Sequence, residues 1–142
     1  MKKWIVFLVV IGGVIALVVS CNAWKRASEQ RLHVFLREDQ VVSIKFWGSP
    51  EPKEPVDRMA TKEEISQIIR WFNAATDIRA NKEFVGSTPM AGFQITLQSG
   101  KRVGIIRSGK DFEVQRDDVM KDNISYWAKQ NDIRDFLNDL AK

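Results

Sequence analysis

The fold class is decided by residues 92–116, which read GFQITLQSGKRVGIIRSGKDFEVQR. Apolar and polar residues alternate through three short segments of this stretch: 92–98, 101–107 and 111–116. Such alternation is typical of strands that bury one face and expose the other. Ser99-Gly100 and Ser108-Gly109 separate the three segments and are typical of tight hairpin turns. The stretch therefore predicts an antiparallel meander.

Alternation also predicts strands on both sides of this meander. These further segments, in decreasing order of clarity, are residues 41–47, 124–128, 31–37 and 56–60. The last of them follows residues 48–55, which are expected to be a loop because proline cannot donate to a strand ladder. It is expected to be a short edge strand. Residues 77–91 have no clean period, so we expect them to be mostly loop.

Two amphipathic helices accompany the strands. Thr61 and Glu64 have the spacing of a capping box, and the apolar stripe after them is Ile65, Ile68, Ile69 and Phe72. Asn131 is the expected cap of a second helix, whose stripe is Ile133, Phe136, Leu137 and Leu140. The apolar stripes of the two helices must be buried against another element, and one face of the sheet must be buried as well. We therefore predict an α+β fold of two layers, an antiparallel sheet meander with both helices packed on one face.

The N-terminus has the layout of a secretory signal. Two lysines precede an apolar run over residues 4–19, which ends in VVSC at residues 18–21. This ending resembles the lipobox of bacterial lipoproteins. In that family the cysteine takes a diacylglyceryl group and becomes the mature N-terminus. The resemblance implies removal of residues 1–20 and attachment of lipid to Cys21, with palmitate among its acyl chains.

An uncleaved membrane helix is the alternative interpretation of the same segment. A helix over residues 4–21 would be about 27 Å long, which falls short of the ~30 Å hydrocarbon core. Both interpretations attach the downstream domain to a membrane. The predicted organisation is a signal peptide or anchor at residues 1–20, a tether at residues 21–30 and a single domain at residues 31–142.

The net charge limits the classes of binding partner that are expected, and the cysteine content limits the possible disulfides. The formal charge of the whole chain is +4, and removal of residues 1–20 takes away two lysines and leaves +2. A chain so close to neutrality is not expected to bind nucleic acid. Cys21 is the only cysteine, so no disulfide forms within one chain.

The order of the predicted strands and helices resembles that of a second protein family. The residues that carry this resemblance are the strand at 41–47, TKEEI at 61–65, Ile68-Ile69 and FNA at 72–74, followed by the meander and a short terminal helix. Together they resemble small lipoproteins of spore-forming Gram-positive bacteria that carry a YhfM-like domain. The resemblance covers about residues 40–142 and implies fold and location only, since that family's function is undefined. The proline-rich loop and the basic hairpin of this chain depart from it.

The sequence contains no recognisable catalytic motif, and we expect neither a metal nor a cofactor. His33 is the only histidine and is expected to face solvent from a strand. The aspartates of residues 117–122 lack the glycine and glutamate of a calcium loop. Asp111 and Glu113 share a strand face. They leave open an alternative function, a small cell-envelope hydrolase that acts on glycan or peptide through surface carboxylates.

The candidate binding residues are two tryptophans and two cations. Alternation places Trp47 and Trp127 on the sheet face opposite the main apolar sets of their strands. Lys101 and Arg102 belong to a basic hairpin, which would meet anionic headgroups or wall polymers, or else block edge pairing. We therefore expect a lipid-anchored protein on the extracytoplasmic side of the cell membrane. Its role would be binding an envelope protein or wall polymer, and enzymatic activity is the less favoured interpretation.

Overall fold

The computed structural model describes residues 2–49, 54–81, 91–109, 111–119 and 125–142, with side chains given at Val14 and from residue 17 onward. The strands of this part of the chain are β1 (Val41–Gly48), β2 (Val56–Met59), β3 (Thr76–Asn81), β4 (Ala91–Leu97), β5 (Arg102–Ser108), β6 (Asp111–Arg116) and β7 (Ser125–Lys129). The helices are α1 (Lys2–Gln30), α2 (Lys62–Asn73) and α3 (Asn131–Leu140), and a 3₁₀ turn, η1, spans Glu38–Gln40.

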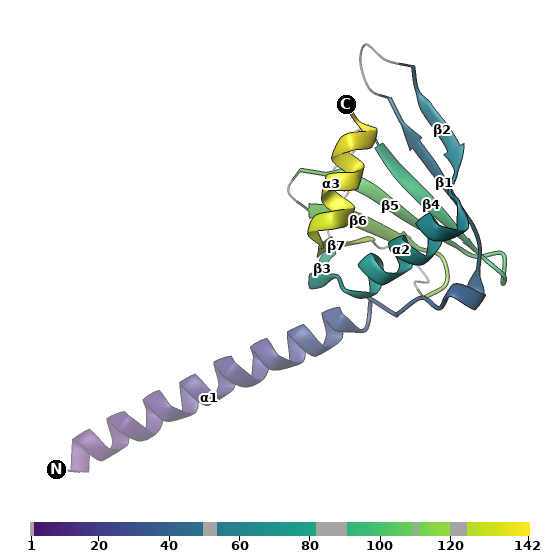
Figure 1. The fold of residues 1–142 in the computed structure, drawn as a ribbon. Helices are drawn as coiled ribbons and strands as arrows, with labels where there is room; N and C mark the ends of the chain where they lie inside the picture. The colour runs from purple at the N-terminus through teal and green to yellow at the C-terminus, as the bar shows by residue number, and fades with distance from the viewer. Residues whose placement is uncertain (1, 50–53, 82–90, 110, 120–124) are drawn as a thin grey trace.

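All of these strands form one antiparallel sheet in the order β2-β1-β4-β5-β6-β7-β3 (Figure 1). The run from β4 to β7 is a meander in which each strand pairs with the next one in the chain, as predicted. The hairpin of β1 and β2 extends one edge, and β3 forms the other edge beside β7. Because α2 connects β2 to β3, the chain passes from one edge of the sheet to the other through this helix.

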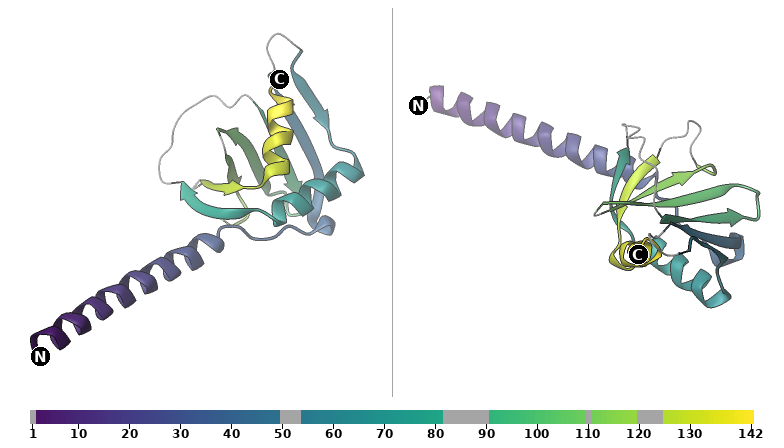
Figure 2. Two further views of the ribbon diagram at one scale, coloured as in Figure 1. Left: turned by 60° about the vertical axis from the view of Figure 1, so that its left-hand side comes forward. Right: turned by 90° about the horizontal axis from the view of Figure 1, so that it is seen from above.

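Both α2 and α3 lie on the same face of the sheet, which confirms the predicted two-layer α+β architecture (Figure 2). The core between the layers contains the inward residues of both helices and of the strands, among them Ile44, Phe46, Phe93, Ile105, Val114, Ile68, Phe72, Ile133 and Leu137. Phe136 of α3 packs edge-on against Phe46 at a ring distance of 5.0 Å. Full burial of each such side chain contributes about 1.5–3 kcal/mol, and this is what holds the helices on the sheet.

The start of α2 is confirmed in detail, and that of α3 is corrected by one residue. The Thr61 hydroxyl accepts a hydrogen bond from the Glu64 amide at 3.3 Å, and the Glu64 carboxylate accepts one from the Thr61 amide at 2.8 Å. At α3 the cap is Gln130, whose side chain accepts from the Ile133 amide at 2.7 Å. Asn131 is instead the first helical residue.

Two of the predicted elements are wrong. Residues 31–37 are not a strand, because β2 and β3 form the two edges of the sheet and the segment joins neither ladder. Residues 77–81, part of the segment 77–91 that was expected to be mostly loop, belong to β3. Asp77 has a positive φ of 53° and the register with β7 shifts beside it, which breaks the two-residue period on which the prediction relied. Ile124 and residues 82–90 lie outside the described residues.

The helix α1 runs without a break through Cys21 to Gln30 and projects away from the sheet (Figure 1). The segment expected as a tether is therefore helical, and Cys21 is exposed on it. Among the residues whose side chains are described, no helix is both long enough and apolar enough to cross a membrane.

Substitution of Gly48 tests how tightly α3 closes on the sheet. A Cβ at Gly48 would overlap the main-chain carbonyl of Leu140, whereas a Cβ at Gly104 would meet Gln115 at an ordinary 3.8 Å. We expect Gly48→Ala to lower the free energy of unfolding by about 1–3 kcal/mol, and Gly104→Ala to raise it by roughly 0.5–1 kcal/mol. Urea denaturation of the two variants measures both. Equal losses would contradict the close contact at Gly48.

Candidate binding surface

A single row of residues crosses the sheet on the face opposite α2 and α3, called here the uncovered face. Strand registers align Trp47 with Gly92, Gly92 with Ile106, Ile106 with Glu113 and Glu113 with Trp127. We call these five residues the tryptophan row. The two indoles stand four strand spacings apart, roughly 19 Å along the sheet. Both tryptophans and Ile106 are partly exposed, so the row presents apolar side chains outside the core.

The indole of Trp47 occupies the space beside Gly92 on the neighbouring strand. A Cβ at Gly92 would stand 2.8 Å from Cε2 of Trp47 and 2.7 Å from the Ile105 carbonyl oxygen, so only glycine leaves room for the ring. The indole is thereby held against β4, and Ile106 comes next in the row. A ring that already packs on the sheet loses less conformational entropy when a ligand contacts it than a freely rotating side chain does.

Polar side chains border the tryptophan row. The adjacent row on the uncovered face carries Lys45, Gln94, Gln115 and Ser125. Lys45 forms an ion pair of 2.9 Å with Asp57 of β2. An apolar centre with a polar rim is the usual anatomy of a binding interface.

An ion-pair cluster closes the β3 end of the row. Arg79, which pairs with Trp127 in the sheet, binds the Asp111 carboxylate, and Lys129 binds Asp77 at 2.6 Å. The hydrogen bond from Lys129 is the main reason that the pKa of Asp77 is lowered. An Asp that stays ionised cannot donate a proton as a general acid near neutral pH. One Asp111 oxygen, Oδ1, is buried without a hydrogen-bond partner.

A cleft of about 1330 Å³ separates α1 from β3, beside the same cluster. Lys25 and Arg26 of α1, Val34 and Phe35 of the segment after it, and Trp127 of the tryptophan row all line the cleft. The acidic side chains in its lining are Glu29 and Asp77, of which Asp77 is held by Lys129. The cleft therefore lacks a pair of free convergent carboxylates.

The structure does not bring Lys101 and Arg102 to the tryptophans. Both lie at the β4–β5 turn, and Arg102 stands 3.5 Å from the Asp117 carboxylate. Arg102 is four residues from Ile106 along β5, or about 13 Å. Arg107, at the far end of that strand, donates to the Asn138 side chain at 2.7 Å. The basic hairpin is thus spread over β5, and Lys110 lies outside the described residues.

Two of the aspartates that were compared with a calcium loop, Asp117 and Asp118, face arginine side chains instead. Arg116 binds Asp118 through two nitrogens, and Asp117 faces Arg102. Asp122 is not among the described residues. Within the described ranges no group of three or more His, Cys, Asp or Glu side chains has the geometry to hold a metal ion.

His33 is buried, contrary to the prediction that it faces solvent. Its exposed fraction is 7%. Nε2 lies 2.8 Å from the main-chain oxygen of Phe72, which only accepts, so Nε2 carries the proton. Nδ1 then accepts from the Tyr126 hydroxyl, also at 2.8 Å. Burial is the main cause of a lowered His33 pKa, and the positive charge of Arg116 adds to it. The partners are 39 and 93 residues away in sequence, so no local pattern reveals them.

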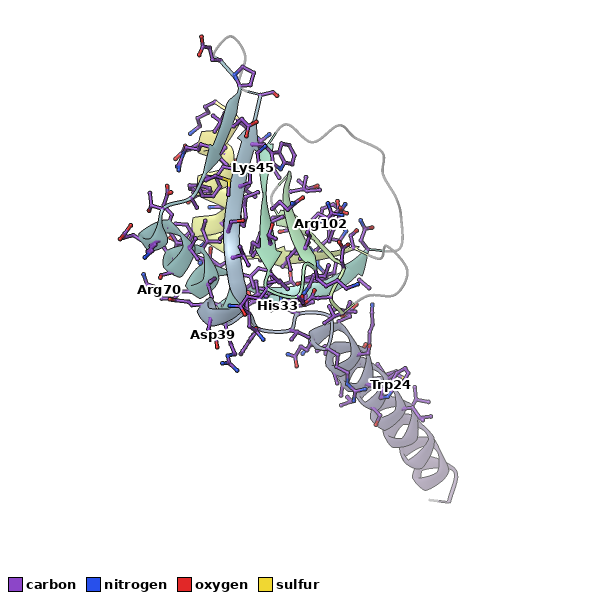
Figure 3. All side chains as sticks on the ribbon, turned by 90° about the vertical axis from the view of Figure 1, so that its right-hand side faces the viewer. Trp24, His33, Asp39, Lys45, Arg70 and Arg102 are labelled. Atoms are coloured by element: carbon purple, nitrogen blue, oxygen red, sulfur yellow. The ribbon has the colours of Figure 1, made fainter. Side chains whose placement is uncertain are left out.

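The segment after His33 is fastened to the domain by two further contacts. The Asn73 side chain accepts from the Leu36 amide at 2.9 Å and donates to the Leu36 carbonyl at 2.8 Å. Arg116, whose side chain is buried, donates to the carbonyl of Val34. We call these contacts and those of His33 the junction clamp. It ties the segment after α1 to α2, β6 and β7. Figure 3 shows His33 at the end of the sheet nearest α1.

Comparison with known proteins yields no relative. No family model, curated protein or solved structure matches this chain. The resemblance to lipoproteins with a YhfM-like domain therefore stays a prediction.

The lowered pKa of His33 predicts a pH-dependent stability. Below about pH 6.5 the histidine of the unfolded chain takes up a proton, while the buried neutral ring of the folded chain resists it. The free energy of unfolding should therefore be highest above that pH and fall as the pH decreases toward the folded pKa, by at most ~1.4 kcal/mol per pH unit. Urea denaturation between pH 7.5 and 5.5 measures this slope. His33→Gln should flatten it, and an unchanged slope in that variant would refute the assignment.

Proposed function

We propose that this chain is a lipid-anchored protein on the extracytoplasmic side of the membrane, whose domain binds a component of the cell envelope. The ligand classes that fit are a wall polymer and an envelope protein. The observation that carries the binding role is the tryptophan row, in which Trp47, Ile106 and Trp127 share the uncovered face.

Support for the anchor comes from the position of Cys21. It comes directly after the apolar run and its side chain is exposed. A diacyl group holds a protein stably on a bilayer, whereas a single chain does so only marginally. With residues 1–20 removed, the helical residues 22–30 would place the domain within about 14 Å of the lipid.

Support for binding comes from the kind of residues in the tryptophan row. Tryptophan is enriched among the side chains that dominate binding energies, because it buries a large area and keeps one polar group. The polar rim of Lys45, Gln94 and Gln115 supplies groups that can hydrogen-bond a ligand. The hydrolase alternative was based on Asp111 and Glu113. It is less well supported, because Arg79 binds the carboxylate of Asp111, one of the two.

Metabolic labelling tests the anchor. We expect wild-type protein to incorporate radiolabelled palmitate and to lose residues 1–20 by mass spectrometry. Cys21→Ser should remain unlabelled and keep its N-terminus, because no thiol is left to accept the lipid. A wild-type protein that is unlabelled and uncleaved would instead support the membrane-helix alternative.

Cosedimentation with isolated cell walls tests the tryptophan row. We expect detergent-solubilised wild-type protein to bind, and Trp127→Ala to weaken binding tenfold or more, since loss of an interface tryptophan costs about 1.4 kcal/mol or more. Trp24→Ala is the matched control, because Trp24 lies on α1 away from the row (Figure 3). Equal weakening by both variants would contradict the role of the row. No binding by the wild type would favour an envelope protein as ligand.

A further inference from the structure

We propose that the base of the domain docks onto the anionic headgroups of the membrane that holds the anchor. The docking surface, called here the basal patch, consists of Trp24, Lys25, Arg26, Arg31, Val34 and Phe35. The proposal rests on the anchoring part of the proposed function and adds a second, non-covalent attachment beside the lipid.

The apolar members of the basal patch are unusually exposed. The exposed fraction is 79% for Trp24, 67% for Phe35 and 44% for Val34. Val34 and Phe35 are adjacent in the chain, and both line the cleft between α1 and β3. Apolar side chains exposed together near a proposed membrane anchor are typical of an interfacial contact.

The junction clamp holds Val34 and Phe35 outward. His33 and Leu36 on either side point into the domain and are fastened there by Tyr126 and Asn73. The carbonyl of Val34 itself accepts from Arg116. A segment tied on both sides of Phe35 has no freedom to turn that ring into the core. The exposure of Phe35 is therefore enforced by the fold.

The charge of the patch suits an anionic surface. Lys25, Arg26 and Arg31 are all exposed, and Glu29 is the sole acidic residue between residues 24 and 35. The formal charges of residues 24–35 sum to +2, which equals the formal charge of the whole chain after residue 20. The other residues after residue 20 therefore carry equal numbers of positive and negative charges. Each Lys or Arg near an anionic leaflet contributes about 1 kcal/mol.

Two basic and two apolar residues of the basal patch line one cleft. Lys25, Arg26, Val34 and Phe35 all line the cleft between α1 and β3. Trp24 stands three helical residues after Cys21, about 4.5 Å along the axis, at the depth where amphipathic rings prefer to lie.

A fluorescent probe at position 35 tests the docking. In the mature lipoprotein the Cys21 sulfur is a thioether, so Phe35→Cys introduces the sole free thiol for a nitrobenzoxadiazole label. The labelled, lipidated protein is placed in vesicles of phosphatidylcholine with or without phosphatidylglycerol. We expect a blue shift of emission in the anionic vesicles. The shift should disappear near 1 M salt, where the Debye length falls to about 3 Å.

Two matched variants make the result decisive. A label at Met59→Cys, which is exposed on β2 at the opposite edge of the sheet, should report water in both kinds of vesicle. The triple variant Lys25→Gln, Arg26→Gln, Arg31→Gln, labelled at position 35, should lose the blue shift yet still incorporate palmitate. A probe at position 35 that reports water in anionic vesicles, on protein whose Cys21 is acylated, would overturn docking alone. A free thiol at Cys21 would overturn the anchor and the docking with it.

Discussion

The hydrogen bonds of His33 join the end of α1 to both layers of the domain. One ring nitrogen contacts Tyr126 of the sheet and the other contacts the main chain of Phe72 in α2. Because both contacts are buried, breaking either would leave a polar group without water or partner. The position of α1 relative to the sheet depends on this histidine, and so does the outward orientation of Val34 and Phe35.

Arg116 completes the same arrangement from β6. A buried guanidinium is tolerated only when its charge is balanced, and here Asp118 balances it in a two-nitrogen contact. The third nitrogen, Nη1, donates to the carbonyl of Val34. Polar groups at this one corner of the core therefore specify where the N-terminal segment lies, while apolar packing of α2 and α3 holds the rest.

Much of the fold was predictable because its signals are local. Alternation in residues 92–116 identified the meander, and the stripes after Thr61 and Asn131 identified both helices. The faces of Trp47 and Trp127 came from the same two-residue period. Residues 76–81 were missed because a positive φ at Asp77 interrupts that period. Residues 31–37 were assigned wrongly, because alternation cannot tell whether a segment has a neighbouring strand.

The sequence by itself determined the elements that repeat with a regular period, and with them the two-layer fold and the faces of its tryptophans. Only the tertiary structure decided which distant side chains meet. It separated Lys101 and Arg102 from Trp47 and Trp127, buried His33 against Tyr126, and placed Trp127 beside the cleft at the base of α1. The reason is physical: periodicity reports which side of an element is apolar, whereas contacts between elements depend on strand order and register across the whole sheet.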